Sequence, residues 1–174
     1  PETIDIIGDS VFENCINLKE VRMPNSVTSI GSYAFSGCTA LTGIVISDSV
    51  TSIGSNAFSG CTALAEIIIP DNVTEIGSYA FQNCTKLASV TLSKNLITIY
   101  TGAFQNCDAL TKIHIPKSLE TGWSDNGVFK NCDGLKEVTF EEGTTRVADC
   151  LFANCTGLER IEIPDTVTAI ENDA

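Results

Sequence analysis

The chain has few residues of the kinds that many partners and environments require. Only ten of its 174 residues are Lys or Arg, against 22 Asp or Glu, and the net charge is −12. Phosphate groups are bound by clustered cations, so this composition argues against nucleic acid and anionic membranes as partners. No apolar run approaches the ~18 residues that a membrane span needs, so membrane insertion is not expected.

Residues for catalysis and metal binding are also scarce. His114 is the only histidine and no Cys-x-x-Cys pair occurs, so a zinc site lacks ligands. His114 is expected on the outer side of a strand and Cys107 in the core, so they cannot form a nucleophile–base pair. The adjacent Glu141 and Glu142 fit a solvated strand end. We therefore expect no enzyme activity, no metal and no cofactor.

An internal repeat runs through the whole chain. Each repeat has a cysteine, with a phenylalanine three residues before it and a leucine three residues after it. The spacings are 23, 23, 23, 23, 25 and 23 residues, between Cys15, Cys38, Cys61, Cys84, Cys107, Cys132 and Cys155. Such a period predicts a solenoid, and the absence of a linker predicts one array over residues 1–174. Because the chain starts at Pro1 and stops at Ala174 within a repeat, we expect a fragment of a longer protein.

Each repeat begins with a strand, as in the unit that starts at Leu64. Leu64, Ile67 and Ile69 are expected to point inward, whereas Glu66 and Ile68 alternate outward with the two-residue period of an extended chain. Equivalent strands one repeat apart run in the same direction, so they are expected to pair in parallel.

The remainder of the unit returns the chain to the next strand. Pro70 is expected to end the strand, because proline has no N–H for the ladder. Val73 and Ile76 form a second apolar pair, and Gly77 is expected to supply a backbone angle that a bulkier residue would resist. The apolar positions from 80 to 87 fit a short helical turn with one buried face.

The repeated pattern Leu-x-x-Ile-x-Ile-Pro-x-x-Val-x-x-Ile-Gly-x-x-Ala-Phe-x-x-Cys resembles the BspA-type, or treponemal-type, leucine-rich repeat. The resemblance covers essentially the whole chain, although Val11, Val128 and Leu151 replace the alanine. It implies a right-handed leucine-rich-repeat solenoid of about seven 23-residue turns. One face would carry a parallel sheet and the return path short helical or irregular turns. It also implies a cell-surface or secreted protein, since several relatives are adhesins that bind host matrix or plasma proteins.

The periodic cysteines can be interpreted in two ways. Adjacent turns lie about 4.8 Å apart, a distance that a disulfide tolerates. Equivalent side chains in a stack point the same way, however, so we favour a ladder of buried free thiols. Cys150 falls outside the period, at a position expected to be exposed, where a reactive thiol is the alternative.

The outward strand positions are the predicted binding surface. They form two columns, which are Glu20, Gly43, Glu66, Ser89, Lys112, Glu137 and Arg160, and Arg22, Val45, Ile68, Thr91, His114, Thr139 and Glu162. Gly43, Val45 and Ile68 form an apolar island between charged ends, which is typical of a partner site. Strands also favour β-branched residues without any partner. The candidate residues on this surface are Arg22, Gly43, Val45, Glu66, Ile68, Thr91 and His114.

Trp123, the only tryptophan, lies in the one repeat that is two residues longer. It could anchor a ligand from a protruding loop, since tryptophan is favoured at interfaces. Alternatively, it could fill the core position that Ile76 and Ile99 occupy in other repeats. We keep it as a candidate binding residue.

Together these features predict a non-enzymatic module that binds a protein or glycoprotein ligand, such as a host matrix or plasma protein. The alternatives are an intracellular scaffold, which free thiols would suit, and a passive structural spacer. End-to-end stacking through uncapped termini is also expected.

Overall fold

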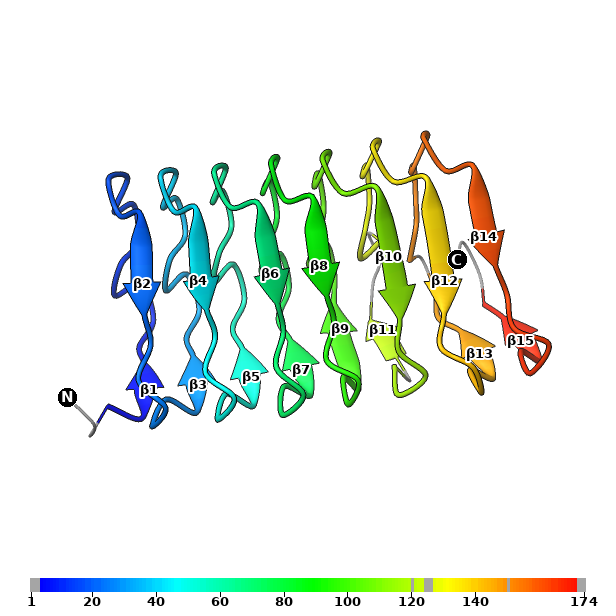
Figure 1. Cartoon of the computed structure of the whole chain (residues 1–174), viewed down its shortest axis with the longest axis horizontal. Coiled ribbons are helices and arrows are strands. Elements are labelled where there is room, and N and C mark those ends of the chain that lie inside the picture. The colour runs from blue at the N-terminus through cyan, green and yellow to red at the C-terminus, as the bar shows by residue number, and fades with distance from the viewer. Residues whose placement is uncertain (1–3, 120, 124–126, 150, 172–174) are drawn as a thin grey trace.

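The computed structural model describes residues 4–119, 121–123, 127–149 and 151–171. The chain forms an elongated stack of similar coils that progresses from one end of the molecule to the other (Figure 1). Each coil contributes one strand to each of two rows, and the rows are connected by turns. The predicted leucine-rich-repeat solenoid with parallel strands is confirmed.

The even-numbered strands form the predicted sheet surface. Their bounds are β2 (Glu20–Arg22), β4 (Gly43–Val45), β6 (Glu66–Ile68), β8 (Ser89–Thr91), β10 (Lys112–Ile115), β12 (Glu137–Phe140) and β14 (Arg160–Glu162). Within them, Ile67 and Ile69 are buried, and Glu66 and Ile68 are exposed, as the two-residue alternation predicted. Parallel ladders join β2 to β4, β6 to β8, and β10 to β12 to β14.

The odd-numbered strands form a second row that the sequence analysis did not predict as sheet. Their bounds are β1 (Ile6–Ile7), β3 (Ser29–Ile30), β5 (Ser52–Ile53), β7 (Glu75–Ile76), β9 (Thr98–Tyr100), β11 (Thr121–Trp123), β13 (Arg146–Val147) and β15 (Ala169–Ile170). The strands β1 to β11 form one continuous parallel sheet, and β13 pairs with β15. Val73 and Ile76, the expected second apolar pair, are both buried on this side of the coil.

The segment that carries the Ala-Phe-x-x-Cys pattern is a series of tight turns, so the expectation of a helical turn was wrong. Tyr79 and Asn83 have φ values of 58° and 59°, a left-handed conformation that interrupts a right-handed helix. The N–H groups of Tyr79, Phe81 and Asn83 instead donate to the next coil, at 2.9, 2.7 and 2.9 Å. Hydrogen bonds between coils therefore alternate with local turns, such as the one in which Gln82 N donates to Tyr79 O at 3.1 Å, and no helix forms.

A column of stacked phenylalanine rings runs along the interior. Neighbouring rings have centroid separations between 5.0 Å, for Phe81 and Phe104, and 5.6 Å, for Phe129 and Phe152. The ring planes of Phe81 and Phe104 differ by only 4°. Rings from Phe35 to Phe129 are fully buried, so each coil contributes one aromatic side chain to a continuous core.

The periodic cysteines form a ladder of free thiols beside this column, and no disulfide bridges them. Each thiol from Cys38 to Cys155 also donates a hydrogen bond to the carbonyl of the phenylalanine in the preceding coil; for example, Cys61 Sγ lies 3.2 Å from Phe35 O. Cys38 to Cys132 are buried as expected, but Cys15 is exposed and Cys155 is half-buried. Those two lie in the terminal coils, where a neighbour covers only one side.

The glycine that recurs on the return path of several repeats has a different role from the predicted one. Gly54 and Gly77 do not have positive φ values. A Cβ atom at Gly54 would instead lie 2.6 Å from the backbone of Gly31 and Ser32, and one at Gly77 would lie 2.5 Å from Ser55 N. The glycines are therefore needed because successive coils approach closely here.

Both end coils expose apolar side chains. Ile6 and Ile16 are 55% and 57% exposed in the first coils, and Ile170 is 58% exposed in the last. Stacking of these ends against another copy stays a prediction.

We expect the phenylalanine column to dominate stability at its centre. Phe81→Ala should lower the free energy of unfolding by about 3–5 kcal/mol, because a fully buried ring is replaced by a cavity. Phe12→Ala should cost much less, since Phe12 is 37% exposed and touches one ring. Denaturant unfolding followed by circular dichroism compares the two; equal losses would contradict a central core column.

We also expect thiol reactivity to follow position in the stack. Burial raises the pKa of Cys84 to about 12, so that thiol stays protonated and shielded at neutral pH. In a Cys150→Ser background, a thiol reagent should modify Cys15 rapidly and leave Cys61 and Cys84 unmodified until denaturant is added. Peptide mapping by mass spectrometry checks this, and rapid native-state labelling of Cys84 would refute it.

Candidate functional site

The outward face of the even-numbered strands carries the two most exposed of the large apolar side chains in the described residues. Val45 is 80% exposed and Ile68 is 66% exposed. Both residues stand beside inward neighbours that are buried, because alternate side chains of a strand point to opposite faces. The expected apolar island of Gly43, Val45 and Ile68 therefore lies on the surface.

This island lines a groove of about 790 Å³ across β2, β4 and β6. Arg22 and Glu66, two of the predicted site residues, lie at its sides, so five of the eight candidates meet at one place. We call this opening the β4 groove. Its size falls within the range of sites that accept small ligands or single side chains of a partner.

Strand pairing is interrupted within the β4 groove. Ladders join β2 to β4 and β6 to β8, but no backbone hydrogen bond joins the residues of β4 to those of β6 in the described chain. The backbone N–H and C=O groups of β4 and β6 thus face the groove without hydrogen bonds to one another. This interruption could not be predicted from the repeat pattern, because β4 and β6 have the same periodicity as their neighbours.

Some charged side chains around the β4 groove have an ion-pair partner and others do not. Arg22 pairs with Glu20, Nε to Oε1, at 3.2 Å. Glu66 and Asp48 also line the groove, and neither carboxylate has an ion-pair partner among the described residues. A cationic ligand would meet two available carboxylates there.

Thr91 and His114, two further candidates, belong to a second and smaller opening. It has a volume of about 380 Å³ and is lined from β8, β10 and β12, again where no ladder joins neighbouring strands, β8 and β10. His114 Nδ1 lies 2.9 Å from Thr139 Oγ1, so the histidine is held by a neighbouring strand. This opening is lined by both polar and apolar residues and shares none of them with the β4 groove.

Trp123 does not share the face of the other candidates. It ends β11, a strand of the odd-numbered row, where its partner in register is Tyr100. Gly122 is paired with Ile99, so the register here keeps the same 23-residue offset that pairs Ile76 with Ile99. A core position for Trp123 stays a prediction. The side chain of Trp123 and residue Cys150 lie outside the described part of the chain.

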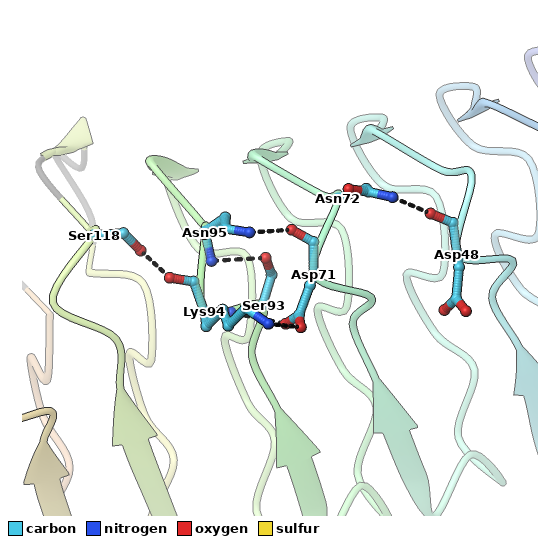
Figure 2. Close-up of polar contacts among 7 residues, drawn as sticks. All are labelled: Asp48, Asp71, Asn72, Ser93, Lys94, Asn95 and Ser118. Atoms are coloured by element: carbon cyan, nitrogen blue, oxygen red, sulfur yellow. Dashed lines mark hydrogen bonds and ion pairs between the residues drawn. The ribbon is translucent and has the colours of Figure 1, made fainter.

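The turns that follow the even-numbered strands are tied together by side chains (Figure 2). Asn72 Nδ2 donates to Asp48 O at 2.7 Å, Asn95 Nδ2 to Asp71 O at 2.9 Å, and Ser118 Oγ to Lys94 O at 2.8 Å. Lys94 additionally forms an ion pair with the Asp71 carboxylate, whereas no contact is drawn to the Asp48 carboxylate. This edge is a structural ladder that leaves the Asp48 carboxylate available at the end of the β4 groove.

Two further features were sought in the described residues, a metal-binding cluster and a membrane-spanning helix. No group of three or more His, Cys, Asp or Glu side chains there is placed to hold a metal ion. The described chain also contains no helix of the length and apolarity that crossing a bilayer requires. The arrangement on the sheet face is suited to binding by shape and charge.

The chain was then compared with known proteins. Residues 5–122 and 124–174 match the model of the BspA type leucine rich repeat region, in six copies. No curated protein is significantly similar in sequence.

Similar solved structures include several bacterial proteins. A leucine rich repeat protein of T. pallidum (TpLRR) is 32% identical with a TM-score of 0.77, over 87% of this chain and 72% of that one. A leucine-rich repeat protein from Bacteroides ovatus is 28% identical with a TM-score of 0.66, over 99% of this chain and 59% of that one. Pneumococcal vaccine antigen PcpA, at 20% identity and a TM-score of 0.57, shares the fold.

The ion pair at the turn edge makes a testable prediction. Hydrogen bonds from Lys94 hold the pKa of the Asp71 carboxyl below its ordinary value of 3.8. Because the folded-state pKa is lowered, the pair stabilises the fold above pH 3.8 and this contribution is lost as pH falls through the folded-state pKa. Lys94→Met should return the Asp71 pKa toward 3.8 in an NMR titration. An unchanged pKa would show that Lys94 is not the cause.

Proposed function

Because the chain belongs to the BspA-type leucine-rich repeat family, we propose that it is a non-enzymatic protein-binding module that acts through the outward face of its even-numbered strands. Leucine-rich repeat arrays serve as interaction modules, and their stacked strands provide a broad, rigid surface. The observation that carries the proposal is the β4 groove, where Val45 and Ile68 remain exposed in the N-terminal half of the array. Apolar patches with polar rims mark interaction sites.

The proposed partner is a protein or glycoprotein outside the cell, such as a host matrix or plasma protein. Support for a cell-surface or secreted location comes from the family resemblance. The thiol ladder is compatible with this location, because the buried cysteines are screened from oxidants and each donates to a carbonyl. Adhesion is therefore the role we assign to the parent protein.

The unpaired thiols also favour a second candidate, an intracellular scaffold, since reduced cysteines persist in a reducing compartment. The extracellular module and the intracellular scaffold are distinguished by whether the native cell secretes the protein. Detection of the protein only inside the cell would favour the scaffold.

Paired substitutions test the proposed face. Val45→Glu with Ile68→Lys should weaken binding to a responsive matrix or plasma protein by at least about tenfold, because both residues are exposed where a partner would bury them. The melting temperature should hardly change, because neither side chain contributes to the core. Solid-phase binding to a panel of purified matrix and plasma proteins measures the effect.

A matched pair on the odd-numbered row provides the control. Thr74→Glu with Ile97→Lys introduces the same charges at exposed positions of adjacent coils, one of them also aliphatic. This pair should leave binding intact. Loss of binding in the control alone would move the site to the odd-numbered row, and binding to no member of the panel by the unaltered protein would favour the spacer.

A further inference from the structure

Gly43 is a glycine that the fold itself does not require. A Cβ atom at Gly43 would meet no atom within 4 Å, and its φ is not positive. Among the glycines whose surroundings the structure describes, it alone has this freedom: the others have a positive φ or would bring a Cβ within about 3.3 Å of a neighbour, as Gly54 and Gly77 do. A side chain would therefore be accommodated at position 43.

Glycine is also unfavourable at the centre of a strand row, where it packs against nothing and favours other conformations. The equivalent positions in the other even-numbered strands all carry side chains, namely Glu20, Glu66, Ser89, Lys112, Glu137 and Arg160. Gly43 thus leaves a hollow in an otherwise filled column. A glycine within a strand commonly marks a place where a ligand or another backbone approaches closely.

The surroundings of this hollow indicate what it would receive. Val45 and Ile68 provide aliphatic walls, and the lapse in pairing between β4 and β6 leaves backbone polar groups beside it. An apolar side chain placed over Gly43 would contact these walls while its own backbone reached the polar groups. A polar or charged side chain would lose hydration there without a buried partner.

The charged residues of the β4 groove indicate which partner residues would flank that apolar side chain. The carboxylates of Asp48 and Glu66 have no ion-pair partner in the described chain, whereas Arg22 is neutralised by Glu20. Lys19 is the one other cation that lines the groove, which leaves an excess of one negative charge. The whole chain has a net charge of −12, so its field also attracts cations.

We propose that the hollow over Gly43 is an anchor pocket for one large apolar side chain of a partner protein, in a segment where Lys or Arg flanks that side chain and pairs with Asp48 and Glu66. This inference rests on the proposed function, since it specifies the partner of the same face. It makes Gly43 the residue that determines specificity: any side chain at this position would occupy the space of the ligand.

Synthetic nonapeptides provide the probe. One peptide has a central Leu with Lys on both sides, a second replaces the Leu by Ala, and a third replaces the Lys residues by Glu. Titrations followed by ¹H–¹⁵N NMR should show that the Leu–Lys peptide binds tightest of the three. Its shifts should cluster at residues 42–46 and 66–68. Equal affinities for the Leu and Ala peptides, or shifts spread over other coils, would overturn the proposal.

Variants of the protein test the role of the glycine. Gly43→Val should reduce affinity for the Leu–Lys peptide by at least about tenfold, because the valine fills the hollow. The melting temperature should stay equal or rise, since a β-branched residue suits an exposed strand. Ser89→Val adds the same side chain to the same column outside the β4 groove and should leave peptide affinity unchanged. A Gly43→Val protein that binds as tightly as the unaltered chain would refute the anchor pocket.

A separate variant tests the two carboxylates of the β4 groove, those of Asp48 and Glu66. Asp48→Asn with Glu66→Gln should abolish the preference for the Lys-flanked over the Glu-flanked peptide while keeping the preference for Leu over Ala. If the Lys preference persists, the two carboxylates are not the selecting groups and that part of the proposal fails.

The same variants separate this inference from the proposed function. If a matrix or plasma protein binds and Val45→Glu with Ile68→Lys prevents it, but Gly43→Val does not, the face is the binding surface and the anchor pocket is wrong. If neither variant affects binding of that protein, both proposals fail.

Discussion

Stacking of one coil on the next, through backbone hydrogen bonds at strand spacing, is the constraint on which the rest of this structure depends. Every side of the coil takes part: even-numbered strands, odd-numbered strands, and the turns in which Phe81 N donates to Ala103 O. Because equivalent atoms must stay in register, each interior position becomes a column. The phenylalanine rings, the thiols and the glycines where coils approach closely all follow from that requirement.

The sequence was sufficient to predict the parts of the fold that a two-residue or a 23-residue period encodes. Ile67 and Ile69 were assigned inward and Ile68 outward, and the structure agrees. The sequence was not sufficient to predict segments whose structure depends on the backbone conformation of individual residues. The pattern from Ala80 to Leu87 has helix-like apolar spacing, but left-handed residues at Tyr79 and Asn83 convert it into turns that bond to the next coil. Spacing alone does not reveal such hydrogen bonding.

The candidate site was predicted as two columns, and the structure divides them. Gly43, Val45 and Ile68 meet in one groove, whereas Thr91 and His114 line another and Trp123 belongs to the opposite strand row. Each opening coincides with a pair of neighbouring strands that no ladder joins, β4 with β6 and β8 with β10. The repeat pattern of the sequence does not distinguish these pairs from the ones that are joined. The sequence likewise does not reveal that the surroundings of Gly43 are open, so that the fold does not require a glycine there.

Hydrogen–deuterium exchange on the whole chain, with and without a saturating bound partner protein, tests the central claim most directly. The account predicts that the partner slows exchange in the segments that contain β2, β4 and β6 and leaves the odd-numbered strands and the asparagine-tied turns beyond Asp71 unchanged. Protection confined to the odd-numbered strands, or distributed evenly over all coils, would contradict it.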